Sequence, residues 1–248
     1  MKRLFWDIET SPNIGFFWKS GFKQNISFDS IIHERKIICI AYKWEGEKKV
    51  HALKWDENQD DKEMLLRFIE VANESDDMVA HFGDSFDLKW FRTRCLYHGI
   101  QTFPFYRTTD TCKLARQYFY FNSNKLDYIA QFLGLGKKKS HPYSLWVDVA
   151  LHRDKKALKD MLAYCKNDVV MLENVYNELI KHCKPNVHVG VLHGNEKWSC
   201  AFCGGTNVSK SKERVTAMGA KRYQMQCSGC GKYYTISNAV YNKYLDRE

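Results

Sequence analysis

The fold is decided by the stretch Leu4-Phe5-Trp6-Asp7-Ile8-Glu9-Thr10, in which an apolar run ends in two acids. Such a run is typical of a buried strand. Because residues i and i+2 of a strand face the same side, Asp7 and Glu9 are expected to project together. Two adjacent like charges are unfavourable unless a proton or a cation relieves them, and a hard divalent metal ion does so. The alternative is an exposed strand end with two solvated acids.

The residues that follow predict an α/β fold with a mixed sheet. Strands are expected at 36–44 and 49–55, joined by a turn at Glu45 and Gly46, so that three strands follow in meander order. Asp60 or Asp61 is expected to cap a helix, because apolar residues then recur at helical spacing. The remaining expected elements are a strand at 78–82, a helix from about 85, a short strand before Asp110, and helices at about 124–133 and 154–182.

Two more segments place acids where a helix begins or within one. In His81-Phe82-Gly83-Asp84-Ser85-Phe86-Asp87-Leu88 a strand gives way to a helix, so Asp84 suits a cap and Asp87 suits the first turn. Further along, Tyr164 and Asp168 stand at i and i+4 and share a helix face. Taken singly, each acid is also explained as a cap or as a residue at the edge of the core.

In chain order, these motifs resemble the proofreading-type 3′–5′ exonucleases of the DEDD superfamily. They are a strand with D-x-E, a strand-to-helix turn with Asp, and a helix with Y-x-x-x-D. The chain looks closest to predicted exonucleases related to the proofreading domain of family B DNA polymerases, and the stretches 110–115 and 124–130 are also similar to that family. The resemblance covers residues 1–183 and implies a ribonuclease-H-like fold: a mixed sheet flanked by helices.

The resemblance implies a site with two Mg²⁺ or Mn²⁺ ions. Asp7 would bridge the ions, Glu9 and Asp168 would complete the water-activating one, and Asp87 would hold the second. Asp87 is preferred to Asp84 because the family's second motif ends in an aromatic residue followed by the acid. Two such ions activate water and stabilise charge on the attacking and leaving oxygens of a phosphodiester.

The resemblance also assigns the chain to the tyrosine subtype. Tyr164 stands four residues before Asp168, whereas Ala163 occupies the position that carries histidine in the other subtype. With an unperturbed pKa near 10, Tyr164 is better suited to orienting the attacking water than to deprotonating it. The second motif departs from the family at His81, where Asn is usual, which leaves the local substrate contact open.

Several residues are predicted to contact nucleic acid, and two segments carry alternatives. The glycines of Gly134-Leu135-Gly136-Lys137-Lys138-Lys139 are read as a helix stop, not as an ATP-binding loop, because the spacing and the Ser/Thr of such a loop are missing. Phe16, Phe17, Trp18 and Phe22 suit core packing, a covering loop, or stacking on terminal bases. The predicted nucleic-acid contacts are Thr10, His81, Lys137, Lys138, Lys139, Arg222 and Tyr223.

Four of the nine cysteines form two C-x-x-C knuckles, Cys200/Cys203 and Cys227/Cys230, each followed by glycine. Two such pairs are typical of one tetrahedral Zn²⁺ site, so a structural zinc ribbon is predicted; redox-active pairs are the alternative. The expected domains are an exonuclease domain at 1–183, a linker at 184–195 and the ribbon at 196–248. Arg222, Tyr223, Lys232, Tyr233 and Tyr234 interleave charge with aromatic rings near the second knuckle and suit nucleic acid, although ribbons also bind proteins.

The positive net charge of the chain is consistent with a nucleic-acid partner. The chain of 248 residues has a net charge of +9, and residues 184–248 hold ten Lys and Arg against four acids. A basic surface attracts polyanions. With no apolar run long enough for a membrane span and no signal-peptide pattern, the protein is expected to be cytoplasmic, in a bacterial or viral replication context.

The sequence therefore predicts a standalone 3′–5′ exonuclease, with DNA and a single-stranded 3′ end favoured and a zinc ribbon that helps to bind substrate. A polymerase or another replication protein is a possible partner, because a chain of this length has no room for a polymerase of its own. The alternatives are a structure-selective endonuclease on the same fold and an inactive nucleic-acid-binding accessory protein.

Overall fold

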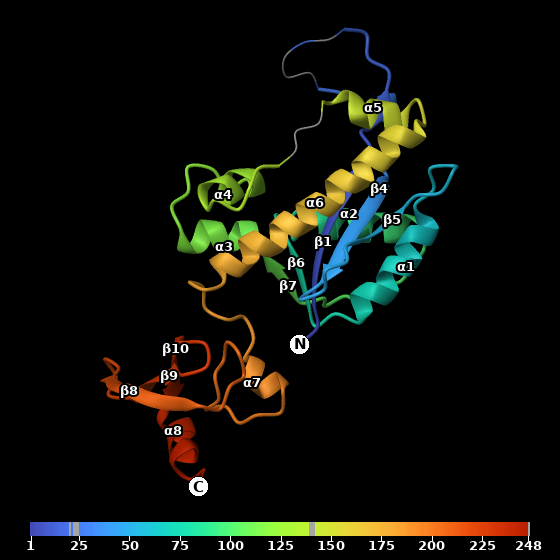
Figure 1. Cartoon of the computed structure of the whole chain (residues 1–248). Helices are drawn as coiled ribbons and strands as arrows, with labels where there is room; N and C mark the ends of the chain where they lie inside the picture. Colours follow the sequence, from blue (N-terminus) through green and yellow to red (C-terminus); the bar gives the residue numbers. More distant parts are fainter. Residues whose placement is uncertain (20, 22–24, 139–141, 248) are drawn as a thin grey trace. The chain divides into compact units, whose positions relative to one another are not determined.

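The structure, a computed structural model, describes residues 1–19, 21, 25–138 and 142–247. The chain forms two compact units, Lys2–His182 and Cys183–Glu248 with Met1 (Figure 1). Each unit has its own apolar core. Within the described ranges, no helix combines the length and the apolar character that crossing a membrane requires.

In its described part, the first unit is built on a five-stranded mixed sheet with the order β5-β4-β1-β6-β7. The central strand β1 (Arg3–Thr10) is antiparallel to β4 (Ile37–Trp44), which is antiparallel to β5 (His51–Lys54). On its other side β1 is parallel to β6 (Asp77–Ala80), and β6 is parallel to β7 (Thr108–Asp110). The mixed sheet and the meander order of the first three strands are thus confirmed.

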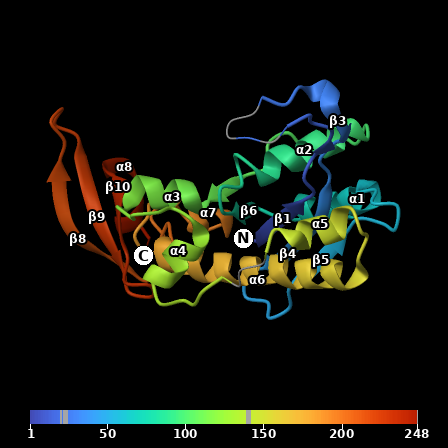
Figure 2. The same ribbon diagram turned by 90° about the horizontal axis from the view of Figure 1, so that it is seen from above.

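Alternate residues of β1 face two layers of helices. One layer contains α1 (Lys62–Asn73) and α2 (Asp87–Tyr97), and the β1 residues that share its apolar cluster are Leu4, Trp6 and Ile8. Phe5 faces the other layer, where its ring meets the edge of Tyr176 on α6 (Lys155–Leu179). The sheet lies between α6 and the α1/α2 layer, as Figure 2 shows.

Three short helices pack against α6. They are α3 (Thr111–Tyr118), α4 (Leu126–Phe132) and α5 (Ser144–Ala150). Asp110 caps α3 directly after β7, and α4 ends before Gly134, whose φ of 70° is the left-handed conformation that commonly follows a helix. The helix stop predicted at this glycine is confirmed.

A separate two-stranded sheet is formed by residues between β1 and β4 in the chain. It pairs β2 (Ile14–Gly15) with β3 (Ile31–His33), and a single 3₁₀ turn (Phe28–Ser30) precedes β3. Neither strand was predicted, because two or three residues carry no usable alternation. The helices α3 and α5 were also not predicted, because seven or eight residues show too little helical periodicity.

The second unit contains an antiparallel sheet with the order β10-β9-β8. Its strands are β8 (Val208–Val215), β9 (Lys221–Cys227) and β10 (Tyr233–Ser237). The helix α8 (Asn238–Leu245) packs on this sheet through Tyr244, and the one-turn helix α7 (Val189–Leu192) precedes the first cysteine knuckle.

Candidate metal-binding active site

Three carboxylates meet on the side of β1 that faces α6. Ligand oxygens of Asp7, Glu9 and Asp168 all lie within 4.8 Å of one another. Asp7 and Glu9 share this side of β1 because they are two residues apart in the strand. Asp168 lies among the buried residues of α6. A divalent ion that binds oxygen at about 2.0–2.6 Å can contact three oxygens so close together. The residues present therefore suit Mg²⁺ or Mn²⁺.

The fourth predicted ligand, Asp87, lies beside this group without belonging to it. Asp87 begins α2, is 2% exposed, and accepts a hydrogen bond at 3.1 Å from the backbone N–H of Ile8, which lies between Asp7 and Glu9. Asp84, by contrast, is ion-paired with Lys113 at 2.7 Å. The placement favours Asp87 over Asp84, and metal binding by Asp87 stays a prediction.

Burial makes this cluster of acids electrostatically costly. Burial is the largest cause of the raised pKa values of Glu9 and Asp87, which are about 8 and about 7. Burial also raises the pKa of Asp7 well above its ordinary value. Neighbouring acids add to the effect, since Asp87 and Asp168 both raise the pKa of Asp7. A cation bound among the carboxylates would relieve this cost.

One protein cation already lies in the cluster. Nζ of Lys138 is 2.6 Å from Oδ2 of Asp168 and 4.4 Å from the centroid of the Tyr164 ring. Burial opposes the charged form of Lys138, but the carboxylate of Asp168 outweighs it and raises the pKa of the lysine. Asp127 on α4 holds this loop, because its Oδ1 accepts the backbone N–H of Lys138 at 2.6 Å.

Tyr164 lies one turn before Asp168 on α6, as its spacing predicted. Burial, and the charges of Asp168 and Glu9, raise the pKa of its hydroxyl to about 12, although Lys138 lowers it. The phenol is therefore protonated at neutral pH. It can donate a hydrogen bond to water but is a poor base.

Two residues at the site were not predicted. Trp146 on α5 donates a hydrogen bond to Glu9, and its ring meets the edge of Tyr164 at 6.0 Å between centroids. Sγ of Cys165 lies 3.5 Å from the backbone oxygen of Asp7 and 3.7 Å from its Oδ2. Cys165 could have been found from its position three residues before Asp168 on the same helix stripe. No local pattern connects Trp146 with Glu9.

The predicted nucleic-acid contacts in the first unit have different surroundings. Both ring nitrogens of His81 bond within the protein, Nδ1 to Oγ1 of Thr111 at 2.9 Å and Nε2 to the backbone oxygen of Asn124 at 2.8 Å. Thr10 is partly buried at a β-bulge, and Lys137 is exposed. Lys139 lies outside the described residues. Contact with nucleic acid stays a prediction for all four.

The aromatic stretch after β1 is exposed. The exposed fractions are 79% for Phe16, 61% for Phe17 and 105% for Trp18, so the interpretation as core packing is wrong for these three residues. Phe22 lies outside the described residues. A covering loop and stacking on bases remain as explanations.

In the second unit, one predicted contact is corrected and one is kept. Tyr223 is only 6% exposed, and its ring stacks on Tyr241 of α8 with 3.8 Å between centroids. It was expected to contact nucleic acid, but in a strand alternate residues face opposite sides, and Tyr223 faces the core. Arg222, its neighbour, is exposed.

The four knuckle cysteines form one cluster. Sγ of Cys200 is 3.6 Å from Sγ of Cys230, and Sγ of Cys203 is 3.6 Å from Sγ of Cys227. Thiolates bound at about 2.3 Å around a tetrahedral Zn²⁺ would be about 3.8 Å apart, whereas a disulfide needs about 2.05 Å. The separations suit a tetrahedral metal site.

A further group of possible ligands, Asp60, Asp61 and His98, is better explained as structural. Nε and Nη2 of Arg94 bond the two oxygens of Asp61 at 2.8 and 2.9 Å, and Asp61 also accepts the backbone N–H of Ile37. These bonds occupy both oxygens of the Asp61 carboxylate, so the group is explained without a metal ion. Of the two residues predicted to cap α1, Asp61 occupies the cap position without a side-chain cap bond, while Asp60 accepts the N–H of Lys62 at 2.9 Å.

Comparison with known proteins identifies the class. A family model described as the RNase H superfamily matches residues 32–180, more than half of the chain. The chain belongs to the RNase H superfamily. The match begins after β1, so it does not include Asp7 or Glu9. No curated protein matched the sequence.

One similar solved structure is the family B DNA polymerase from the hyperthermophilic archaeon Pyrobaculum calidifontis. The TM-score is 0.55 at 16% sequence identity, and the alignment covers 72% of this chain and 24% of the polymerase chain. This chain thus spans about a quarter of the polymerase's length. At this identity the similarity shows a shared fold, and the ribonuclease-H-like fold expected from the motifs is confirmed.

Proposed function

We propose that this protein is a metal-dependent 3′–5′ exonuclease that acts on single-stranded ends, with DNA favoured over RNA. The observation that carries the proposal is the convergence of Asp7, Glu9 and Asp168 within 4.8 Å, with Tyr164 one helical turn from Asp168. Membership of the RNase H superfamily supports a nuclease, since nucleases of this class use divalent metals.

The chemistry divides between bound ions and side chains. Two divalent ions, when bound, would activate water and neutralise charge on the phosphate. Asp7, Glu9 and Asp168 would hold them, with Asp87 contributing from the start of α2. Tyr164, protonated at neutral pH, would orient the attacking water, and Lys138 would supply positive charge for the phosphate.

Removing the carboxylates tests the proposal. Asp7→Asn and Asp168→Ala should each lower the rate of digestion by about 1,000-fold or more, because metal binding supplies several kcal/mol of transition-state stabilisation. The matched control is Asp84→Asn, which removes the acid three residues before Asp87. The carboxylate of Asp84 is ion-paired with Lys113 and lies outside the cluster. Equal losses in Asp84→Asn and Asp7→Asn, or undiminished digestion by Asp7→Asn, would refute the site.

The substrate and the polarity need a separate assay. The purified chain is incubated with DNA and RNA labelled at the 3′ or the 5′ end, with Mg²⁺ or Mn²⁺. Early release of the 3′ label as mononucleotide is the expected result. Cleavage of circular or end-blocked strands would favour the endonuclease alternative, and binding without any cleavage would favour the inactive accessory protein.

For the second unit we propose a structural Zn²⁺ held by the four clustered cysteines, and a role in retaining substrate. A unit of this size has a small core, and metal binding adds folding free energy. Cys227→Ser should release zinc and weaken binding of long strands more than it lowers turnover of short oligonucleotides. Binding of long strands at wild-type affinity after zinc loss would contradict the retaining role.

A further inference from the structure

The sheet of the second unit has one face that packs on α8 and one that is open to solvent. Tyr223, Met225 and Ile236 point to the α8 side and are buried. The residues between them on β9 and β10 are exposed or partly exposed. Because side chains alternate along a strand, these residues project from the opposite face.

Cross-strand pairing defines the composition of the open face. Its three rows, read from β10 through β9 to β8, are Tyr233–Gln226–Ser209, Thr235–Gln224–Lys212 and Ser237–Arg222–Arg214. We call these nine residues the open face. They include three cations, one aromatic ring and no acid.

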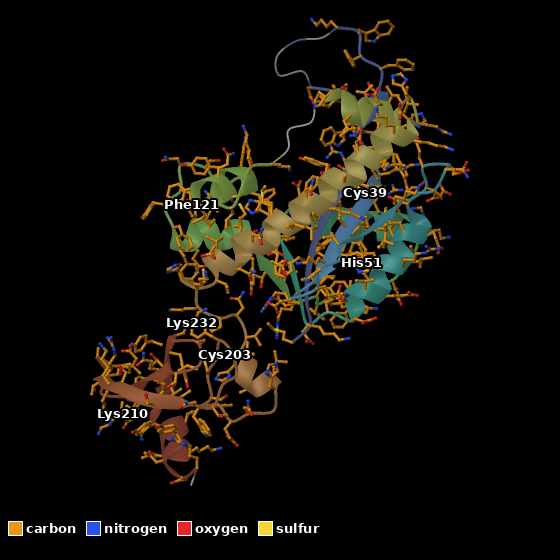
Figure 3. All side chains as sticks on the ribbon, in the orientation of Figure 1. Cys39, His51, Phe121, Cys203, Lys210 and Lys232 are labelled. Carbon is orange, nitrogen blue, oxygen red and sulfur yellow. The ribbon has the colours of Figure 1, made fainter. Side chains whose placement is uncertain are left out.

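A β-bulge brings one of the cations to this face. The register shifts between Lys210 and Lys212, so that Lys210 pairs with Met225 and Lys212 pairs with Gln224. Lys210, labelled in Figure 3, consequently belongs to the α8 side, where Nζ lies 5.6 Å from the centroid of Tyr241. Without the bulge, Lys210 and Lys212 would share a face; with it, Lys212 joins Arg214 and Arg222.

The positive charge of the open face is not neutralised within the described residues. Arg214 and Arg222 stand directly opposite each other, an arrangement of like charges that destabilises a sheet. In the described part of the chain, no ion pair involves Lys212, Arg214 or Arg222. Glu213, the acid between two of them, points to the α8 side and is ion-paired with Lys221 at 3.3 Å. An anionic partner would relieve the repulsion between the arginines.

We infer that the open face binds the backbone of a single-stranded nucleic acid. Arginine and lysine bind phosphates, and the amides and hydroxyls of Gln224, Gln226 and Thr235 can donate hydrogen bonds to the backbone or to base edges. At the other end of the face Tyr233 is 49% exposed and can stack on an unpaired base, which a duplex does not offer. The face measures about 13 Å along the strands and about 10 Å across them, which suits a short stretch of strand.

This inference rests on the nuclease function proposed above, since it names the surface that retains the substrate. It also changes which residues take part. Near the second cysteine knuckle, Arg222 and Tyr223 were both predicted to contact nucleic acid, but these neighbours lie on opposite faces. Arg222 belongs with Arg214 and Lys212, and the aromatic contact comes from Tyr233.

The test measures binding apart from cleavage. Full-length zinc-loaded protein carrying Asp7→Asn is titrated against fluorescent 20-nucleotide dT and U strands at several salt concentrations, and anisotropy gives the affinity. Arg214→Gln/Arg222→Gln should bind roughly tenfold more weakly, and the slope of log affinity against log salt should fall by about 1.4, since each phosphate contact on a single strand contributes about 0.7. The matched control, Lys197→Gln/Lys243→Gln, removes the same charge from exposed residues outside the open face and should change affinity by at most about twofold.

A second pair of variants tests the aromatic contact. Tyr233→Ala should weaken binding to both strands several-fold, whereas Tyr233→Trp should keep it, because stacking is tolerant of base identity. Zinc content and near-ultraviolet circular dichroism show whether each variant is folded. A folded Tyr233→Ala that binds as the parent does, or a duplex bound as tightly as the single strand, would overturn the single-strand assignment.

Failure of the inference and failure of the nuclease proposal have different signatures. Equal affinities of the arginine and lysine double variants, or binding of polyglutamate as tight as that of the oligonucleotide, would overturn the open face whatever the enzyme does. Weakened binding in the arginine variant of a protein that does not cut with Asp7 intact would support the open face and refute the nuclease.

Discussion

Nζ of Lys138 lies 2.6 Å from Oδ2 of Asp168, so that a loop following α4 places a cation against a carboxylate of α6. The backbone of Lys138 is held by Asp127, and its side chain lies over the ring of Tyr164. In the proposed nuclease, this position would let Lys138 contact a phosphate at the carboxylate cluster.

Lys138→Met should lower turnover by roughly 100-fold without loss of Mn²⁺ binding, because it removes a preorganised positive charge but no metal ligand. Turnover of a short oligonucleotide and calorimetric titration with Mn²⁺ are the two measurements. Lys159→Met, at an exposed position of α6 outside the predicted contacts, is the control and should cut normally. Wild-type turnover in Lys138→Met would contradict this role.

Trp146→Phe should move the pH dependence of metal binding to higher pH. Burial is the largest cause of the raised pKa of Glu9, and the hydrogen bond from Trp146 lowers that pKa. Loss of a hydrogen bond worth about 1 kcal/mol raises the pKa of Glu9. The pH at which Mn²⁺ binding is half-maximal should therefore rise by about 0.5–1 pH unit. Mn²⁺ affinity measured from pH 6 to pH 9 checks this. A uniform loss at all pH values, with no shift, would mean that Trp146 only packs.

The metal-free site should make the protein less stable as pH rises. The folded pKa values of about 8 for Glu9 and about 7 for Asp87 exceed the unfolded values of about 4.3 and 3.9, so between pH 4 and pH 8 the folded state binds more protons than the unfolded state. Stability must then fall as pH rises through this window. The loss of each 1 kcal/mol lowers Tm by about 2–4 °C in a domain of this size.

Scanning calorimetry at pH 5 and pH 8 measures this change. The protein is freed of loosely bound divalent ions by dialysis, under conditions that retain the zinc proposed for the cysteine site. Asp87→Asn should reduce the pH dependence, and added Mn²⁺ should reduce it in the wild type, because metal binding favours the ionised carboxylates. Stability that rises between these pH values would be inconsistent with the raised pKa values.

Asp61→Ala should destabilise the first unit by about 3–5 kcal/mol, because it leaves the buried charge of Arg94 without its partner. Asp61 is 0% exposed and Arg94 is 4% exposed. Burial alone would raise the pKa of Asp61, but bonds from Arg94, His98 and Ile37 lower it below its ordinary value. The stabilisation is therefore present above pH 4 and is lost as pH falls through the folded pKa.

Urea unfolding followed by tryptophan fluorescence measures the effect of Asp61→Ala, since six of the seven tryptophans lie in the first unit. The difference from wild type should shrink as pH falls below about 4, because the lowered pKa of Asp61 delays its protonation until then. Glu63→Ala is the control, because its ion pair with Arg67 is exposed and worth at most about 1 kcal/mol. A loss in Asp61→Ala no larger than in Glu63→Ala would show that the buried pair contributes little.

The parts predicted best from sequence are those set by local periodicity. The alternation in β1 placed Asp7 and Glu9 on one face, and the i, i+4 spacing on α6 placed Tyr164 and Asp168 together. The same rules missed short elements such as α3 and α5, and they cannot rank Asp84 against Asp87, because that choice depends on the backbone of β1 and on Lys113.

The open face of the second unit shows the same limit. Simple alternation along Lys210-Ser211-Lys212-Glu213-Arg214 puts all three cations on one face, whereas the β-bulge separates Lys210 from the others. Burial of Tyr223 against Tyr241 likewise depends on α8, which begins fifteen residues further along the chain. Neither result follows from spacing alone.

By itself, the sequence determined the chemical groups and their local faces: paired acids at a strand end, an acid and a tyrosine on one helix face, and two cysteine knuckles. These follow from the repeats of strand and helix, which act over a few residues. The tertiary structure alone decided which groups meet, namely Lys138 with Asp168, Trp146 with Glu9, and Arg214 with Arg222. The first two pairs join segments distant in the chain, and the third is set by the register of a hairpin that contains a β-bulge. All three therefore depend on packing and strand register, which no local pattern encodes.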